Sequence, residues 1–158
     1  MAVENYISIQ QTEGYRSHPI EDHGKLRFQY FELAAASVTP VGDANSTATL
    51  CLLPPGRVRV LPWLSRVSGG IFGASRTLDI GHAAYQKRDS AGEALEAENL
   101  EAFLANLDVS AAVNAVAFGT VLKYDLYSKS GVEVKARIQG ATWTVNIPIS
   151  WFIAYIYE

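Results

Sequence analysis

The residue types that carry catalysis or bind metals are few in this sequence and poorly spaced for either task. His18 and His23 stand five residues apart beside two acidic residues, a spacing that matches no defined metal site. Asp79 and His82 fall in a strand-like stretch, where residues three apart point to opposite faces and cannot share one ion without a bulge. We therefore expect solvated or structural roles for these four side chains, and neither a metal nor a cofactor.

Signatures of nucleophilic catalysis and of phosphate binding are also missing. No Gly-x-Ser-x-Gly elbow occurs. Cys51, the only cysteine, lies in an apolar run that favours a buried, inert thiol and excludes an intrachain disulfide. The glycines between positions 69 and 73 lack the lysine and the following helix of a P-loop. We expect a protein that is not an enzyme, and a small hydrolase built around His82 is the least favoured hypothesis.

Arginines and aromatic residues alternate in the middle of the chain, between positions 57 and 76. This pattern suits the recognition of carboxylates or of single-stranded nucleic acid, but a solvated face of edge strands is the simpler explanation. Arginine is also enriched at protein–protein interfaces together with tryptophan and tyrosine. Together with the aromatic C-terminal segment, the cluster supplies the candidate interface residues: Arg57, Arg59, Trp63, Arg66, Trp151, Tyr155 and Tyr157.

Composition limits the class of protein that can present these residues. A chain of 158 residues fits one domain, and its charged fraction of 18% lies below the usual value of about 25%. Thirteen basic against sixteen acidic residues give a net charge of −3, which argues against a nucleic-acid partner. No secretory signal and no apolar run of about 18 residues occur, so neither secretion nor a membrane partner is expected. Residues 1–24 read as an N-terminal arm or a poorly ordered leader, and residues 25–158 as the folded domain.

The elements that must position the candidate residues are mainly strands. Residues 132–139 alternate between apolar and charged side chains, which predicts a half-buried strand. Residues 25–34 also alternate and predict a strand, with Leu26, Phe28, Tyr30 and Glu32 on one side and Arg27, Gln29, Phe31 and Leu33 on the other. The C-terminal residues 149–157 are so apolar that they must be sheltered, either as a central strand or in a subunit interface.

About nine short strands with turn residues every 8–12 positions predict an all-β fold, an antiparallel β-sandwich or barrel. A possible short strand at residues 6–9 would precede them. One short α-helix is expected near residues 91–107, because Ser90 and Glu93 fit a capping box and an apolar stripe follows at helical spacing. In an alternative, only residues 99–107 are helical. The stripe consists of Leu100, Phe103, Leu104 and Leu107.

Four segments carry a resemblance to a known class of protein. They are LPPGRVRVLPWLSRV (residues 53–67), ASRTLDIGHAAY (74–85), NLDVSAA (106–112) and GATWTVNIPISW (140–151). They are similar to small proteins encoded among the head genes of tailed bacteriophages. The resemblance implies a capsid decoration (cement) protein, a β-sandwich or jelly-roll module that acts as a trimer or dimer on the outer face of the shell. It identifies no binding positions.

The leading hypothesis is therefore a non-enzymatic virion protein, made in the host cytoplasm, which stabilises the capsid surface by bridging major capsid subunits. Low charge and many aromatic residues suit a module whose surface other protein copies cover. The alternative is a carbohydrate-binding or receptor-binding module of a phage fibre or spike, which would bind through exposed aromatic residues such as Trp63.

Overall fold

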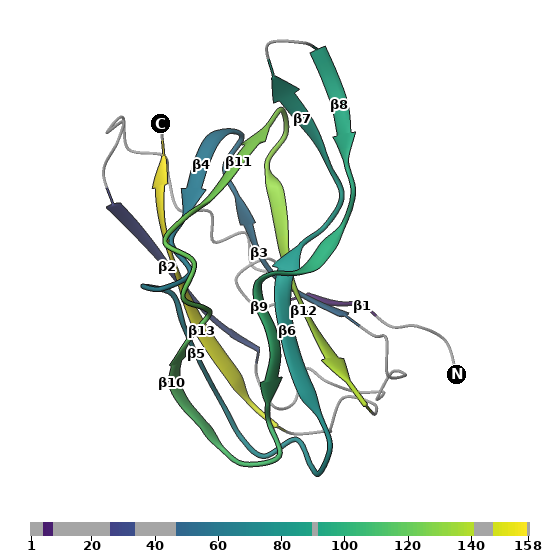
Figure 1. The fold of residues 1–158 in the computed structure, drawn as a ribbon, viewed down its shortest axis with the longest axis vertical. Helices are drawn as coiled ribbons and strands as arrows, with labels where there is room; N and C mark the ends of the chain where they lie inside the picture. Colours follow the sequence, from purple (N-terminus) through teal and green to yellow (C-terminus); the bar gives the residue numbers. More distant parts are fainter. Residues whose placement is uncertain (1–4, 8–25, 34–46, 90–91, 141–146, 158) are drawn as a thin grey trace.

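The computed structural model describes residues 5–7, 26–33, 47–89, 92–140 and 147–157. In this part of the chain all regular structure is β-strand, arranged in two sheets that pack face to face (Figure 1). Apart from one short parallel pair, all strand pairs are antiparallel. The predicted β-sandwich is confirmed.

The first sheet has five strands, and its order places strands that are distant in sequence next to one another. In spatial order they are β1 (Asn5–Ile7), β3 (Thr47–Leu53), β12 (Val132–Gln139), β6 (Thr77–His82) and β9 (Asn99–Asp108). The short β1 pairs in parallel with β3 and overlaps the strand predicted at residues 6–9. Residues 8–25, which hold most of the predicted N-terminal arm, lie outside the described part, so the arm and the domain boundary stay predictions.

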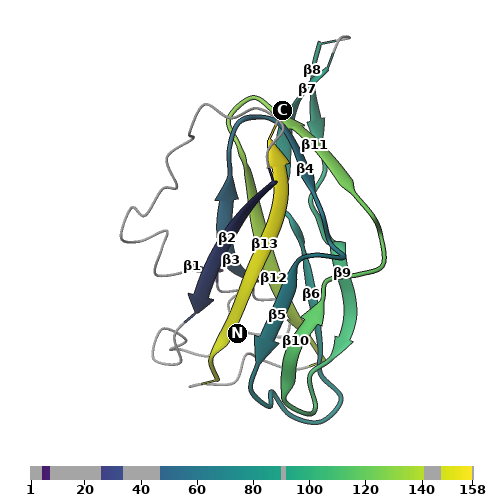
Figure 2. The same cartoon turned by 90° about the vertical axis from the view of Figure 1, so that its left-hand side faces the viewer.

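The second sheet has eight strands and forms the opposite layer, seen face on in Figure 2. Its main path is β10 (Val113–Ala117), β5 (Arg66–Gly69), β13 (Ile149–Tyr157), β4 (Gly56–Val60), β11 (Tyr124–Ser128), β7 (Tyr85–Asp89) and β8 (Gly92–Glu96). An eighth strand, β2 (Leu26–Leu33), pairs with β13 along its whole length. The chain passes repeatedly from one sheet to the other, as in jelly-roll and Greek-key folds.

Side chains from the facing sides of the two sheets fill the space between them. On β12, residues 132, 134, 136 and 138 are buried and the residues between them are not, as the alternating pattern predicts. From the second sheet, Phe31 stacks on Trp151, with ring centroids 6.2 Å apart. The side chains that face inward are thus buried in the sandwich core, and on a strand such as β12 only the outward side chains are available for other contacts.

The predicted helix near residues 91–107 is wrong, because the structure forms β8 and β9 there. The register of β9 on β6 shifts twice, and each shift inserts extra β9 residues. Leu107 pairs with Leu78 and Leu104 with Ile80, so three positions on β9 match two on β6. These bulges turn the two-residue period of a strand into the three- and four-residue spacing that resembles a helix. Ser90 of the expected capping box lies outside the described residues.

Gly81 explains how β9 can approach β6 so closely. A Cβ atom at this position would lie 1.9 Å from the carbonyl oxygen of Asn99 and 2.5 Å from the carbonyl carbon of Leu100. Both are backbone atoms, so no side-chain rotation could relieve the contact. A glycine within a strand can mark a bulge or a close backbone approach, and both occur at this position.

Candidate interaction surface

His82 and Asp79 have structural surroundings on opposite sides of β6. The His82 ring is fully buried among aromatic rings, with centroids 5.3 Å from Tyr85, 5.7 Å from Tyr124 and 6.1 Å from Phe103. Its Nδ1 lies 3.0 Å from the carbonyl oxygen of Ala83, which can only accept, so Nδ1 donates. Nε2 lies 3.2 Å from the Tyr124 hydroxyl.

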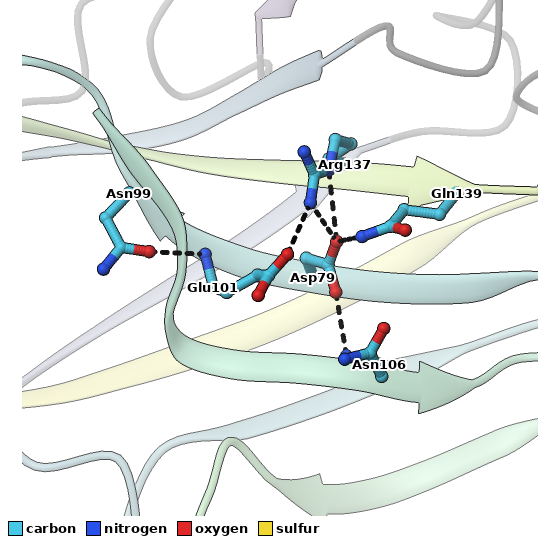
Figure 3. A network of polar contacts seen from close by, with 6 residues as sticks. All are labelled: Asp79, Asn99, Glu101, Asn106, Arg137 and Gln139. Atoms are coloured by element: carbon cyan, nitrogen blue, oxygen red, sulfur yellow. Dashed lines mark hydrogen bonds and ion pairs between the residues drawn. The ribbon is translucent and has the colours of Figure 1, made fainter. Parts of the chain in front are cut away.

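The Asp79 carboxylate is the centre of a polar network on the outer side of the five-stranded sheet (Figure 3). Arg137 donates to it from Nε at 3.1 Å and from Nη2 at 2.7 Å, and the Gln139 amide also donates to it. The backbone N–H of Asn106 donates to its other oxygen at 2.8 Å. Arg137 also reaches Glu101 on β9, at 2.9 Å.

This network fastens the irregular part of β9. Asn106 has a φ of 55°, a conformation unusual for a residue other than glycine, and its N–H points to Asp79. A buried carboxylate is tolerated here because it forms an ion pair with Arg137 and accepts hydrogen bonds on both oxygens. The arrangement holds the β6, β9 and β12 strands together.

The other residues considered for chemistry give no assembled site. Burial raises the pKa of the Cys51 thiol far above its ordinary value, which keeps the thiol protonated and inert. Among the described residues, no three His, Cys, Asp or Glu side chains gather closely enough to hold a metal ion. His18 and His23 lie outside the described residues. Nor does this part of the chain contain a helix long and apolar enough to cross a membrane.

Of the predicted interface residues, the three C-terminal aromatic residues mainly contact other residues of the same chain. Trp151 and Tyr155 are 1% and 2% exposed, because β13 is a central strand flanked by β2 on one side and by β4 and β5 on the other. Tyr157 is half-buried, and the guanidinium of Arg27 lies 5.5 Å from its ring centroid. The central-strand alternative thus explains why this segment is sheltered, and Trp151 and Tyr155 have no ring surface left for a partner.

The buried Ser65 links β13 to the turn between β4 and β5. Its hydroxyl accepts from the backbone N–H of Ala154 at 3.0 Å and donates to the carbonyl oxygen of Leu61 at 3.0 Å. The Leu61 N–H in turn donates to the carbonyl oxygen of Ala154 at 2.9 Å. These bonds bridge the point where β13 passes from its pairing with β5 to its pairing with β4.

The predicted arginines, by contrast, share the outer face of the eight-stranded sheet. Arg66 pairs with Phe152 across β5 and β13, and Arg59 pairs with Ile156 across β4 and β13. Arg57 lies two residues before Arg59 and has the same outward orientation. Trp63, in the turn between β4 and β5, is 43% exposed.

An apolar stripe runs along the same face beside these arginines. Cross-strand pairing aligns Tyr30 with Phe152 and Leu26 with Ile156, with Phe28 between them. The Phe28 and Phe152 rings meet edge to face at 6.0 Å. Leu26, Phe28 and Tyr30 are 46%, 57% and 60% exposed. We call these five side chains, Leu26, Phe28, Tyr30, Phe152 and Ile156, the apolar stripe.

The arginines beside the apolar stripe differ in their partners, because Arg59 pairs with a carboxylate and Arg66 bonds to backbone carbonyl oxygens. Arg59 Nε lies 2.8 Å from Asp125, and the ammonium group of Lys123 lies 3.4 Å from the same carboxylate. Desolvation opposes ionisation of Asp125, but the hydrogen bonds and positive charges of Arg59 and Lys123 outweigh it and lower the pKa of this carboxyl. Arg66 donates instead to the backbone carbonyl oxygens of Trp63, at 2.5 Å, and Ser65, at 3.0 Å, so its charge faces no carboxylate of the described residues.

The sequence indicated the apolar stripe, although none of its five residues was among the candidate interface residues. In residues 26–33, Leu26, Phe28 and Tyr30 alternate with a second side that holds Phe31 and Leu33. A strand with apolar side chains on both faces normally has both faces covered. Here Phe31 and Leu33 are buried in the core and the other face stays open, which is the pattern of a strand with surface left for a partner.

Comparison with solved structures identifies the same fold in one chain of a phage capsid. A chain in the structure described as the capsid of Ralstonia phage GP4 superposes with a TM-score of 0.66 at 17% sequence identity, covering 98% of both chains. A chain of the cyanophage Pam1 capsid asymmetric unit gives a TM-score of 0.49 at 16% identity, covering 90% of this chain and 93% of that one. No family model and no curated protein matches the sequence. The likeness to the GP4 capsid chain establishes a shared fold.

Proposed function

We propose that this chain is a structural protein of a phage virion, which decorates and stabilises the capsid. The observation that supports the proposal most directly is the correspondence of fold with a chain of the GP4 capsid over 98% of both chains. The exposed apolar stripe is the second support, since monomeric proteins rarely leave such a surface open unless something covers it.

In this role the protein is not an enzyme and works by binding. It lies on the outer surface of the shell after synthesis in the host cytoplasm, and its partners are the major capsid protein and further copies of itself, in a dimer or trimer. Several weak contacts made together give high avidity without any one strong site. Neither nucleic acid nor a membrane is a partner, which agrees with a net charge of −3.

The test is to incubate the purified chain with empty shells assembled from the major capsid protein of the same genome. We expect the chain to sediment with the shells and to saturate at a fixed ratio to the capsid subunits, and the decorated shells to withstand higher temperature than bare ones. Light scattering on the free chain should give the mass of a dimer or trimer. A chain that stays in the supernatant at micromolar concentration would contradict the proposal.

Trp63 favours one second candidate, a carbohydrate-binding module of a fibre or spike. Its ring is 43% exposed, and Arg66 fixes the turn that carries it by donating to the Trp63 carbonyl oxygen. A rigid, exposed indole is a common platform for stacking against sugars. Binding on a glycan array that disappears in Trp63→Ala would support this function, and an array without binding would exclude it.

A further inference from the structure

The hairpin of β7 and β8 ends the eight-stranded sheet with a strand edge that can pair with another strand. Among the described strands, β8 pairs only with β7. The hairpin projects beyond the body of the sandwich (Figures 1 and 2). We infer that the edge of β8 pairs with the same edge of a second copy, so that two eight-stranded sheets join across a two-fold axis. This inference rests on the association of copies in the proposed function, and it specifies their contact.

The backbone of β8 directs hydrogen-bonding groups to this edge. The carbonyl oxygen of Gln86 on β7 accepts from the N–H of Lys129 at 3.1 Å, on the side of β7 that faces β11. Residues opposite each other in an antiparallel pair either exchange hydrogen bonds or both point away, so Gln86 and its opposite residue Leu95 point away from each other. The N–H and C=O of Leu95 therefore point to the edge, where a further antiparallel strand would meet them.

Features that protect a terminal strand from such pairing are absent from β8. Two other terminal strands, β9 and β10, have register shifts against their neighbours, and each contains a residue with positive φ, Asn106 and Ala115. In contrast, β8 keeps an unbroken register with β7 over five residues and contains neither proline nor lysine. Its Leu95 side chain is 73% exposed. A regular and unprotected edge of this kind is a template for another strand.

A two-fold axis through Leu95 gives the register that suits the side chains of the hairpin. In this register the two Leu95 side chains lie opposite each other and shelter each other from water. On the other face of the sheet, Ala94 lies opposite Glu96 of the second copy, in one row with Lys87, which is the neighbour of Ala94 on β7. Lys87 and that Glu96 are about 10 Å apart at their backbones, and the short alanine between them lets the two side chains meet.

The charges of this row are self-complementary, which favours a second copy as the occupant. Within one chain, Lys87 Nζ already lies 3.7 Å from the Glu96 carboxylate, and both side chains are 42% exposed. In the dimer both lysines flank each Glu96, which compensates for the diagonal approach of the two carboxylates across the axis. An axis through Ala94 would instead bring the two lysines into one row and place Leu95 opposite Glu93.

Light scattering on the free chain at rising concentration tests the pairing. Five residues of strand make a small contact, so we expect a monomer–dimer equilibrium in the micromolar range. Leu95→Pro removes the N–H that points to the edge without removing a bond to β7, so it should abolish the dimer. Leu95→Lys should weaken the dimer more than about tenfold, whereas Leu122→Lys, at a site 72% exposed between β10 and β11, should leave it unchanged. Thermal unfolding monitored by circular dichroism should confirm that each variant folds.

Exchanged charges distinguish a contact between copies from one within a chain. Glu96→Lys and Lys87→Glu each put like charges in the row, so each variant alone should dimerise more weakly than the wild type. When the two variants are mixed, opposite charges face each other across the axis only, so the mixed dimer should be tighter than either variant's own dimer. If mixing gives no gain, the copies do not pair in this way and the inference fails.

The remaining outcomes separate this inference from the proposed function. A wild type that stays monomeric at every concentration overturns the inference, and if that monomer still saturates the shells, the proposed capsid role stands. A dimer that persists in Leu95→Pro also overturns the inference, because its contact lies elsewhere. A dimer that Leu95→Pro abolishes but that does not sediment with shells supports the inference, while the proposed capsid role fails.

Discussion

Substitution of Gly81 by alanine should be among the most destabilising single changes in this protein. The added Cβ would lie 1.9 Å from the Asn99 oxygen and 2.5 and 2.6 Å from the carbonyl carbon and Cα of Leu100. Ordinary van der Waals contact begins near 3.4 Å, so β9 must move away from β6 by more than 1 Å. Overpacking of side chains costs about 1–3 kcal/mol, and here the obstacle is backbone, so we expect about 4 kcal/mol.

Gly69→Ala is the matched control, since its Cβ would meet Phe72 at 3.4 Å and Ile149 at 3.7 Å, which are ordinary contacts. It should change the unfolding free energy by less than about 1 kcal/mol. Urea unfolding followed by tryptophan fluorescence measures the free energy of unfolding of both variants. In thermal unfolding, Gly81→Ala should lower the melting temperature by roughly 8–16 °C. If Gly81→Ala and Gly69→Ala are equally stable, the close approach of β9 to β6 is not a requirement of the fold.

Three further predictions concern polar groups. Ser65→Ala removes the hydroxyl that links Ala154 to Leu61, and it should lower the free energy of unfolding measured in urea by about 1–3 kcal/mol. Ser65→Thr keeps a hydroxyl and should retain part of this stability. Asp79→Asn removes the buried negative charge that pairs with the Arg137 guanidinium, and it should lower the free energy of unfolding by about 3 kcal/mol at pH 7. Asp125 has a lowered pKa in the folded state, so its stabilising contribution is present at neutral pH and is lost as the pH falls through that pKa. Asp125→Asn should therefore be less stable than the wild type by up to about 1 kcal/mol at pH 7, and the difference should shrink as the pH falls into the acidic range. A difference that stays constant with pH would contradict the assignment.

Strand patterns with a clean two-residue period could be predicted from the sequence. In β12 the alternation of residues 132–139 matches the observed burial residue by residue, because the strand is regular and one face is fully covered. A glycine inside a strand pattern, such as Gly81, indicates a bulge or a close backbone approach, and the structure has both there.

The β9 strand could not be predicted, because its pattern is produced by tertiary structure. Two register shifts against β6 and the φ of 55° at Asn106 spread its apolar residues at helical spacing. The donors and acceptors that hold this irregular path, Asp79 and Arg137, lie on other strands and are far away in sequence. A local pattern therefore favours the helix, and only the long-range pairing reveals the strand.

The two explanations for the apolar C-terminal segment apply to different faces of one strand. Trp151, Ile153 and Tyr155 point inward and are buried in the core, which requires no partner. Phe152 and Ile156 alternate with them, point outward and continue the surface of β2. A strand that needed only the core for shelter would carry polar residues at these outward positions, as β12 does on its own outer face. The sequence of β13 departs from that pattern on the face that also carries Phe28, Tyr30 and the arginines. Burial by the core thus explains the inward half of the segment, and the outward half continues the apolar surface that β2 presents beside it.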